Sequence, residues 1–291
     1  MRSRYGLTTL ALILTSAVTL TAPALAAPGQ SGAHAPLYYV ALGDSLSVGV
    51  QPDATGMNRA SDEGYPDQLH ALLRTTMPHL RLVKLGCSGE TTLTMIRGGV
   101  CRYPKGSQLG EALAFLHAHR QFVTLVTLDV GADDLLPCAS DNAIDPACVS
   151  AAFGTVPAHL FRILTALREA AGPDVPIVAI NYYNPFVAAW LQGPDGQALA
   201  LGSAAALAQF NAVLGGIYGM FSVPTADVAN AFDSADFTTP VVVPGLGVVP
   251  RDVALVCAWT WMCVFPPQGP NHHPNAVGYG VIAEAILQVL P

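Results

Sequence analysis

The sequence has little charge, and few of its basic residues are lysines. Asp, Glu, Lys and Arg make up 11% of the 291 residues, with 13 basic residues against 20 acidic ones. Nucleic-acid binding depends on clustered positive charge, so this balance argues against a nucleic-acid partner. It also argues against an electrostatic hold on anionic lipid. Apolar residues make up 52% of the chain, which supplies a sizeable core and excludes intrinsic disorder.

After its N-terminal region the chain lacks an unbroken apolar stretch of 18 residues, so we expect a soluble mature protein without stable membrane insertion. The N-terminal region itself has a positively charged start, an apolar segment and an A-x-A motif that ends at Ala26. This pattern predicts a secretory signal peptide over 1–26, an N-terminal extension over 27–36 and a secreted domain over 37–291. An uncleaved membrane anchor is the alternative. Cleavage leaves 11 basic against 20 acidic residues, a net charge of −9.

The sequence also lacks a C-x-x-C motif, and its only adjacent histidines, His272 and His273, are followed directly by proline. We therefore expect neither a metal site nor a cofactor. The six cysteines form three local couples, which favours disulfides in an exported chain. Six cysteines permit fifteen pairings. The clustering favours Cys87–Cys101, Cys138–Cys148 and Cys257–Cys263.

Apolar segments of strand length alternate with segments of helical periodicity. The predicted strands cover residues 37–42, 80–85, 122–130, 175–180 and 225–229. The predicted helices cover residues 65–77, 109–116, 158–171, 198–221 and 275–289. Two segments interrupt this order, a long excursion over 233–251 and a short disulfide loop over 257–271. The alternation indicates one α/β domain with a parallel sheet covered on both faces.

Small and polar residues follow three of the predicted strands. Ser45 comes just after the first strand, residues 86–92 follow the second, and residues 131–134 follow the third. Because ligands of parallel α/β sheets bind at the carboxyl ends of the strands, we expect these turns to meet at one edge of the sheet. A plain turn is the alternative interpretation of Ser45, since Gly, Asp and Ser all favour turns.

Four blocks now stand in order along the chain: Gly43-Asp44-Ser45-Leu46, Gly86-Cys87-Ser88-Gly89-Glu90-Thr91, Gly131-Ala132-Asp133-Asp134 and His273-Pro274-Asn275. Together they resemble the GDSL, or SGNH, family of serine hydrolases over about residues 37–290. The three cysteine couples are similar to the secreted lipase and esterase branch of that family. The resemblance implies a three-layer α/β/α sandwich with a flavodoxin-like parallel sheet. It also implies an esterase or lipase that acts on a small-molecule or lipid ester.

The resemblance assigns roles to single residues. Ser45 is the candidate nucleophile and His273 the candidate base, because an imidazole titrates near working pH. His272 is expected to face solvent. The backbone N–H groups of Ser45 and Gly89 are the expected donors to the oxyanion, and the third block puts Asp133 at the remaining oxyanion position.

Two departures from the family pattern affect this assignment. The third block of the family carries Asn, whereas Asp133 stands here, and an ionised carboxylate can only accept hydrogen bonds. The family also carries Asp two or three residues before the histidine, whereas Asn271 and Pro270 stand here. We therefore expect a Ser45–His273 dyad in which a main-chain carbonyl near residues 257–271 orients the imidazole.

Three functions follow from these observations. The first is a secreted carboxylic-ester hydrolase that acts as a monomer. The second is an inactive or weakly active relative that binds lipid or glycan. The third is a deacetylase or acyltransferase of polysaccharides. The apolar segments 241–249 and 259–265 lean slightly toward acyl chains over sugars. Trp259 and Trp261 are expected to pack the disulfide loop, with a substrate wall as the alternative.

Overall fold

The structure is a computed structural model that describes residues 36–139 and 143–291. The predicted signal peptide, and the predicted extension as far as residue 35, lie outside the described residues. The cleavage site and the domain boundary at residue 37 therefore stay predictions.

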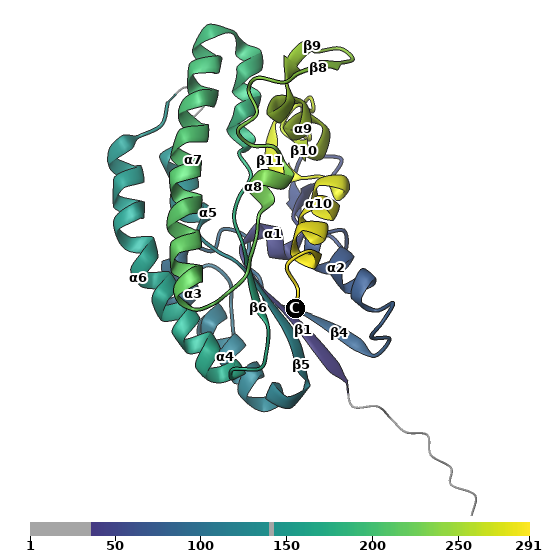
Figure 1. Cartoon of the computed structure of the whole chain (residues 1–291), viewed down its shortest axis with the longest axis vertical. Helices are drawn as coiled ribbons and strands as arrows, with labels where there is room; N and C mark the ends of the chain where they lie inside the picture. Colours follow the sequence, from purple (N-terminus) through teal and green to yellow (C-terminus); the bar gives the residue numbers. More distant parts are fainter. Residues whose placement is uncertain (1–35, 140–142) are drawn as a thin grey trace, which may run out of the picture. The chain divides into compact units, whose positions relative to one another are not determined.

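A five-stranded parallel sheet forms the centre of the described domain (Figure 1). Its strands are β1 (Leu37–Gly43), β4 (Leu80–Lys84), β5 (Val123–Asp129), β6 (Ile177–Ile180) and β7 (Thr225–Ala226). They lie in the order β4-β1-β5-β6-β7, and β1 pairs in parallel with both β4 and β5. In chain order this is 2-1-3-4-5, the flavodoxin-like arrangement, which confirms the predicted fold class. The topological switch point, where such sheets bind ligands, lies between β1 and β5.

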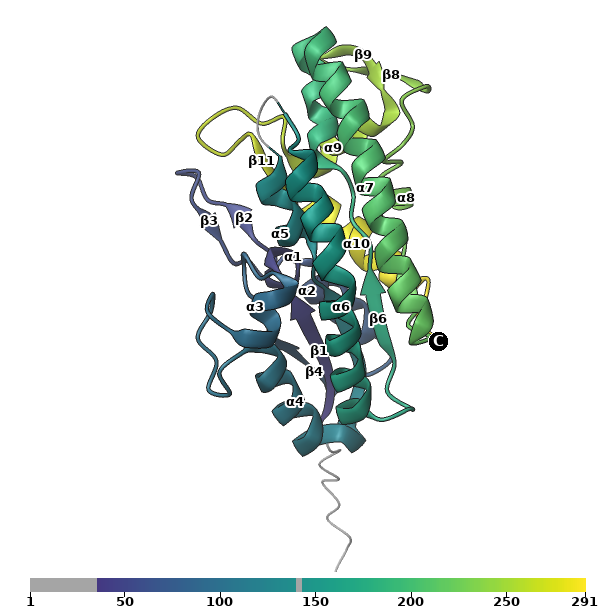
Figure 2. The same cartoon turned by 90° about the vertical axis from the view of Figure 1, so that its left-hand side faces the viewer.

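Helices cover both faces of the sheet (Figures 1 and 2). One layer consists of α2 (Tyr65–Leu73), α8 (Val228–Ala231) and α10 (Ala276–Leu287). The other consists of α3 (Thr92–Arg97), α4 (Gln108–His119), α6 (Pro146–Ala171) and α7 (Pro194–Met220). Helices of one layer contact one another, as α10 does with α2 and α6 does with α4 and α7. The three layers of the predicted sandwich are therefore confirmed.

Short elements connect these layers. They are α1 (Ser45–Val48), β2 (Gln51–Pro52), β3 (Asn58–Arg59), η1 (Arg120–Phe122), α5 (Ala132–Leu135), η2 (Leu136–Cys138), η3 (Pro185–Gln192), β8 (Pro240–Val243), β9 (Gly247–Pro250), α9 (Arg251–Trp259), β10 (Thr260–Trp261) and β11 (Asn271–Pro274). The pairs β2–β3, β8–β9 and β10–β11 each form a separate antiparallel sheet. Figure 2 shows β2, β3, β8, β9 and β11 at the end of the domain toward which β1 and β6 point.

Two helices begin earlier than predicted. α6 begins at Pro146 instead of residue 158, and α7 begins at Pro194 instead of residue 198. Proline suits the first turn of a helix, where its missing N–H would have no partner. The side chain of Asp145 caps α6 by accepting from two backbone N–H groups. Pro157 lies inside α6 and interrupts the sequence pattern, which explains the error.

The two interrupting segments contain more regular structure than predicted. The predicted excursion over 233–251 contains the hairpin of β8 and β9. The predicted disulfide loop over 257–271 contains the end of α9 and the strand β10, which pairs with β11. Both regions contain several proline and glycine residues, so single-sequence patterns carry little information about them.

α6 and α7 are long and apolar enough to cross a membrane by length and composition alone, with mean hydropathy of 1.4 and 1.5. Each also contributes fully buried side chains to the central core, such as Ile163 in α6 and Leu214 in α7. Core helices of globular domains combine these two properties, because one side of the helix packs on the sheet.

Three disulfides link Cys87 with Cys101, Cys138 with Cys148, and Cys257 with Cys263, as predicted. Such bridges are typical of extracellular proteins. No group of three or more His, Cys, Asp or Glu side chains is placed to hold a metal ion within residues 36–139 and 143–291.

Candidate active site

Ser45 is the first residue of α1 and comes two residues after the end of β1. Asp44 caps this helix by accepting from the N–H of Leu46 at 2.9 Å. Gly43 has a φ of +140°, and a Cβ on it would lie 2.0 Å from Oδ1 of Asp129. Only glycine fits there, so the sequence Gly-Asp-Ser is what allows the chain to turn sharply from strand into helix.

Two buried carboxyl groups, those of Asp44 and Asp129, lie under this turn. Asp129 accepts from the N–H of Ser47 at 3.0 Å and from the hydroxyl of Tyr65 at 2.9 Å. Burial, and then the charge of Asp133, raises the pKa of Asp44 to about 8. Burial, and then the charge of Asp44, raises the pKa of Asp129 well above its usual range. The pair therefore keeps a proton at neutral pH, which ties the ends of β1 and β5 together without a buried pair of like charges.

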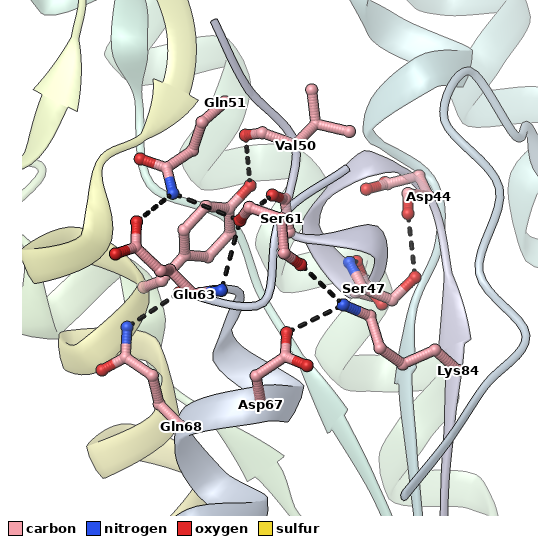
Figure 3. A network of polar contacts seen from close by, with 12 residues as sticks. Asp44, Ser47, Val50, Gln51, Ser61, Glu63, Asp67, Gln68 and Lys84 are labelled. Carbon is pink, nitrogen blue, oxygen red and sulfur yellow. Dashed lines mark hydrogen bonds and ion pairs between the residues drawn. The ribbon is translucent and has the colours of Figure 1, made fainter. Parts of the chain in front are cut away.

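A polar network holds the chain that follows Ser45 (Figure 3). The carbonyl of Gly49 accepts from the hydroxyl of Ser61 at 2.6 Å, and that hydroxyl accepts from the amide of Gln51 at 3.2 Å. The ammonium group of Lys84 donates to the carbonyl of Ser61 at 2.9 Å and to Asp67 at 2.8 Å. These contacts join the loop after α1 to both β4 and α2, so the helix that begins with Ser45 is supported from both sides.

Glu90 and Gln108 connect the second turn to the turn that contains Ser45, and neither was predicted as a site residue from the sequence. The amide of Gln108 donates to Glu90 at 3.0 Å and to the carbonyl of Gly43 at 2.9 Å, while its oxygen accepts from the N–H of Gly43 at 2.7 Å. Glu90 is indicated by its place in a matched block, but nothing in the sequence singles out Gln108. Gly89 has a φ of +84°, and a Cβ on it would meet only Val100, at 3.8 Å, so its backbone faces open space.

Asp133 lies on α5, directly after β5, and lines the same pocket as Ser45. Its Oδ2 atom is buried and has no hydrogen-bond partner among the described residues. Burial, followed by the charges of Asp134 and Glu90, raises the pKa of Asp133 to about 6. The neighbouring Asp134 instead accepts from the backbone N–H and the hydroxyl of Thr92, each at 2.8 Å. Of the two adjacent carboxyl groups, Asp133 thus faces the pocket and Asp134 anchors the second turn.

His273 lies on β11, and the side chain of Asn271 orients it. Oδ1 of Asn271 lies 2.7 Å from Nδ1 of His273 and accepts from the backbone N–H of His273 at 3.0 Å. The backbone N–H of His273 can only donate, which fixes the accepting end of the Asn271 amide, and the other end of the amide donates to Asn58 at 2.7 Å. The prediction that a main-chain carbonyl orients the imidazole is therefore wrong. Asn271 stands two residues before His273, where the family carries its acid, and its side-chain amide contacts the imidazole.

This contact defines the state of the imidazole. Because Oδ1 of Asn271 is an acceptor, Nδ1 of His273 carries the proton and Nε2 is left as the basic atom. Nε2 is buried and has no partner among the described residues. Burial, and then the nearby His272, lowers the pKa of His273 to about 3. β11 and α1 are in contact, so the free nitrogen belongs to the same region as Ser45.

The expectation that His272 faces solvent is wrong. Its side chain is half-buried and lines the pocket that Ser45 also lines. Its carbonyl accepts from the hydroxyl of Tyr183, which holds β11 against the main sheet. Burial lowers the pKa of His272, so it is uncharged near neutral pH.

Trp259 and Trp261, the two tryptophans of the predicted disulfide loop, contact residues outside that loop. The ring of Trp259 meets that of Phe232 edge-on at 5.2 Å, and the indole N–H of Trp261 donates to Gln51 at 3.3 Å. Neither ring lines the pocket, and neither do the segments 241–249 and 259–265 that had suggested an acyl-chain site. The preference for acyl chains over sugars that these segments suggested therefore stays a prediction.

The pocket beside Ser45 contains about 830 Å³ of empty space, counting the part that is open to solvent. Asp44, Ser45 and Asp133 lie together in its lining. Ser45 and Asp133 thus lie at the carboxyl ends of β1 and β5, where a parallel sheet of this order binds its ligand. The strand β11, which carries the oriented imidazole of His273, contacts α1.

The model of the GDSL-like lipase/acylhydrolase family matches residues 41–281. The chain belongs to this family. Membership supports ester hydrolysis as the general activity, and the matched range includes all four sequence blocks. A comparison with curated proteins found no significant match.

Solved structures with the same fold include several ester hydrolases at low sequence identity. A phospholipase A1 from Streptomyces albidoflavus NA297 has a TM-score of 0.54 and 21% identity, with 88% of this chain and 100% of that chain covered. An extracellular lipase from Streptomyces rimosus has a TM-score of 0.55 and 20% identity, covering 87% and 100%. A catalytic mutant of an acetylxylan esterase from Geobacillus stearothermophilus has a TM-score of 0.52 and 13% identity, covering 87% and 93%. At these identities the likeness shows the fold.

Proposed function

We propose that the protein is a secreted serine esterase in which Ser45 is the nucleophile and His273 the general base. The observation that carries this proposal is the contact between Asn271 and Nδ1 of His273, at 2.7 Å, which leaves Nε2 free in the region of Ser45. A nucleophile, a base and a third group that orients the base form the arrangement needed for acyl transfer.

In the proposed reaction Nε2 of His273 accepts the proton of the Ser45 hydroxyl while the oxygen attacks the ester carbonyl. The imidazolium then gives that proton to the leaving alkoxide, and water hydrolyses the acyl-enzyme by the same proton transfers in reverse. Asn271 keeps the correct tautomer, as the acid of a triad does. It stabilises imidazolium less than a carboxylate would, because it carries no charge.

The oxyanion of the tetrahedral intermediate is bound by the N–H groups of Ser45 and Gly89 and by the carboxyl group of Asp133. A carboxyl group donates a hydrogen bond only when it is protonated. With its pKa raised to about 6, Asp133 is protonated in mildly acidic solution and becomes a repulsive charge above that range. His273, with its pKa lowered to about 3, is still a base there. The proposed enzyme therefore works best between about pH 3 and pH 6.

We propose further that the mature protein is secreted and acts as a monomer on a small-molecule or lipid ester, without a nucleic-acid partner. Support for secretion comes from the signal-peptide pattern of the sequence and from the three disulfides. The acidic net charge argues against nucleic acid.

The test uses the chain from residue 27, p-nitrophenyl butyrate and a fluorophosphonate probe, without added metal. We expect hydrolysis, with the probe attached to Ser45 in the peptide map. Ser88 is an exposed serine of the second turn, so Ser88→Ala serves as the matched control and should leave labelling unchanged. Ser45→Ala should abolish both hydrolysis and labelling.

Absence of both hydrolysis and labelling in the unmodified protein would favour the inactive binding protein. Labelling of Ser45 with hydrolysis restricted to acetylated polysaccharide, or with transfer to an alcohol, would favour the deacetylase or acyltransferase.

A further inference from the structure

The backbone N–H of Gly43, at the end of β1, bonds a side chain instead of a neighbouring strand. β1 and β4 pair in parallel, and the carbonyl of Gly43 accepts from the N–H of Cys87 at 3.0 Å. In a regular parallel ladder of this register the N–H of Gly43 would donate to the carbonyl of Leu85. That carbonyl accepts from the hydroxyl of Tyr103 at 2.6 Å, and the N–H of Gly43 donates to the side-chain oxygen of Gln108 at 2.7 Å. A side chain from α4 thus completes the end of β1, just before the turn into α1.

Gln108 makes this contact with both ends of its amide. Its nitrogen donates to the carbonyl of Gly43 at 2.9 Å and to Glu90 at 3.0 Å. Because a backbone N–H can only donate and a backbone carbonyl can only accept, Gly43 alone fixes the orientation of the amide. Gln108 is fully buried and is the first residue of α4. The helix therefore presents an oriented N–H group to Glu90.

Glu90 connects this amide to the second turn, which contains Gly89. Glu90 follows Gly89 directly, and its own N–H donates to the carbonyl of Cys87 at 3.1 Å. The second turn is therefore joined to Gly43 twice, by a main-chain contact through Cys87 and by a side-chain contact through Gln108. Two contacts fix the position and the tilt of the turn, because a single contact would leave it free to pivot.

The contact between Glu90 and Gln108 is costly for the fold. Glu90 is 1% exposed, and its Oε1 atom has no hydrogen-bond partner among the described residues. A buried carboxyl group with an unpaired oxygen costs free energy, and an apolar side chain of similar volume would fill the space without that cost. Packing alone therefore does not account for a carboxyl group here, whereas the need for an acceptor at the amide of Gln108 does.

We propose that the amide of Gln108 and the carboxyl group of Glu90 form a positioning pair that sets the separation of the two proposed oxyanion donors. These donors are the N–H groups of Ser45 and Gly89, so the inference rests on the proposed function. Gln108 bonds to Gly43, two residues before the first donor, and to Glu90, directly after the second. Oxyanion donors act on the transition state more than on the bound ester, so a displaced donor lowers kcat and leaves KM nearly unchanged.

The first test compares two substitutions of Glu90 that both remove its charge. Glu90→Gln keeps an oxygen that can accept from the amide of Gln108, whereas Glu90→Met has a similar volume and cannot accept. With p-nitrophenyl butyrate, at the pH of highest activity for each protein, Glu90→Gln should keep kcat within about threefold of the unmodified protein. Glu90→Met should lower kcat by about tenfold to 10²-fold and change KM by less than about threefold.

Equal kcat values in the two Glu90 variants would overturn the inference. A rise in KM with an unchanged kcat would overturn it as well, because the pair would then act on substrate binding. The activity of the unmodified protein tests the proposed function separately.

The second test separates positioning from the stability of α4. Gln108→Met removes the amide at similar volume, and the control Ser107→Ala removes the N-terminal cap of the same helix, which accepts from the N–H of Gly110 at 3.0 Å. Both variants should lower Tm, but only Gln108→Met should lower kcat, by about tenfold to 10²-fold. An equal loss of kcat in both variants would show that Gln108 acts only through helix stability, and an unchanged kcat in Gln108→Met would show that it does not act at all. Either result would overturn the inference.

Amide hydrogen exchange tests the positioning pair without catalysis. In the chain from residue 27, peptides over the two turns, 43–48 and 86–91, should exchange at least about threefold faster in Glu90→Met than in Glu90→Gln. The peptide over residues 240–250, in the hairpin of β8 and β9, is the internal reference and should exchange equally in both. Faster exchange in both turns would support the pair even if no ester were cleaved. Equal exchange in the turns would overturn the inference, whatever the activity of the unmodified protein.

Discussion

The two sides of the site differ in how the fold builds them. Ser45 and Asp133 follow strands of the central sheet, and β1 and β5 bring them together at the switch point of that sheet. His273 lies outside that sheet, on the two-stranded sheet of β10 and β11. Side-chain contacts hold it there, from Asn271 to Asn58 and from Tyr183 to the carbonyl of His272. The side of Ser45, the proposed nucleophile, is thus positioned by backbone topology, and the side of His273 by specific hydrogen bonds.

The two sides also differ in charge, in a complementary way. The family pattern has an amide on the oxyanion side and a carboxylate on the histidine side, whereas this chain has Asp133 and Asn271. Relative to the family pattern, the carboxyl group therefore lies on the oxyanion side instead of beside the base. In the proposed mechanism the site works with both groups neutral, which holds between the pKa of His273, about 3, and that of Asp133, about 6. The two departures from the family pattern, Asp133 and Asn271, are therefore compatible with the proposed catalysis in mildly acidic solution.

The largest effect is expected when the proposed base, His273, is removed. His273→Ala should lower kcat by about 10³-fold or more, because His273 is the proposed acceptor of the Ser45 proton. His272→Ala is the matched control, since it alters an adjacent imidazole in the pocket lining and should change kcat less than about fivefold. Both are measured with p-nitrophenyl butyrate at pH 5. If His272→Ala abolished activity while His273→Ala stayed active, His272 would be the base instead of His273.

The second-largest effect is expected when a negative charge is placed beside His273. Asn271→Asp places a carboxylate on Nδ1, which raises the pKa of His273 and stabilises the imidazolium in the transition state. We expect kcat at pH 8 to rise by about tenfold and the acid limb of the pH profile to move upward. Asn275→Asp adds the same charge at the cap of α10 and should leave the acid limb in place. An unchanged acid limb in Asn271→Asp would show that Asn271 does not act on His273.

The smallest effect concerns stability on the nucleophile side. The folded-state pKa of Asp44 is raised to about 8, so the folded protein holds a proton that the unfolded chain releases. This stabilisation is lost as the pH rises through about 8. Tm should fall by about 2–4 °C between pH 7 and pH 9. Asp44→Asn should flatten this slope in differential scanning calorimetry, whereas Asp62→Asn, at an exposed position, should not. If the Tm of the unmodified protein did not change between pH 7 and pH 9, this would contradict the proton that the pair of Asp44 and Asp129 is expected to keep at neutral pH.

The central sheet could be predicted because its inner strands β1, β5 and β6 are largely buried on both faces. β5 and β6 read as nearly continuous apolar runs, which is the pattern of such strands. The extra turns of α6 could not be predicted, since Pro157 interrupts their pattern. The hairpin of β8 and β9 could not be predicted either, because two four-residue strands rich in valine leave no distinct period.

The parts of the site that follow strands of the central sheet could be predicted, whereas the parts that depend on side-chain contacts could not. The position of Ser45 and Asp133 could be predicted because strand ends in a parallel sheet converge. The role of Asn271 could not, since its amide lies between the backbone N–H of His273 and the side chain of Asn58, which is 213 residues away in the sequence. Gln108 was missed for a similar reason: its contacts with Gly43 and Glu90 arise only after α4 packs near β1.

The account depends most directly on the protonation of Asp133. The decisive measurement is kcat/KM for p-nitrophenyl butyrate from pH 3 to pH 9, for the unmodified protein and for Asp133→Asn. We predict a bell for the unmodified protein, with an acid limb from His273 and a decline as the pH rises through about 6. Asp133→Asn should lose that decline and exceed the unmodified protein at pH 8 by about tenfold or more, since one oxyanion donor contributes roughly 10²–10³ in rate. Identical profiles for the two proteins would contradict the account, because residue 133 would then not face the oxyanion.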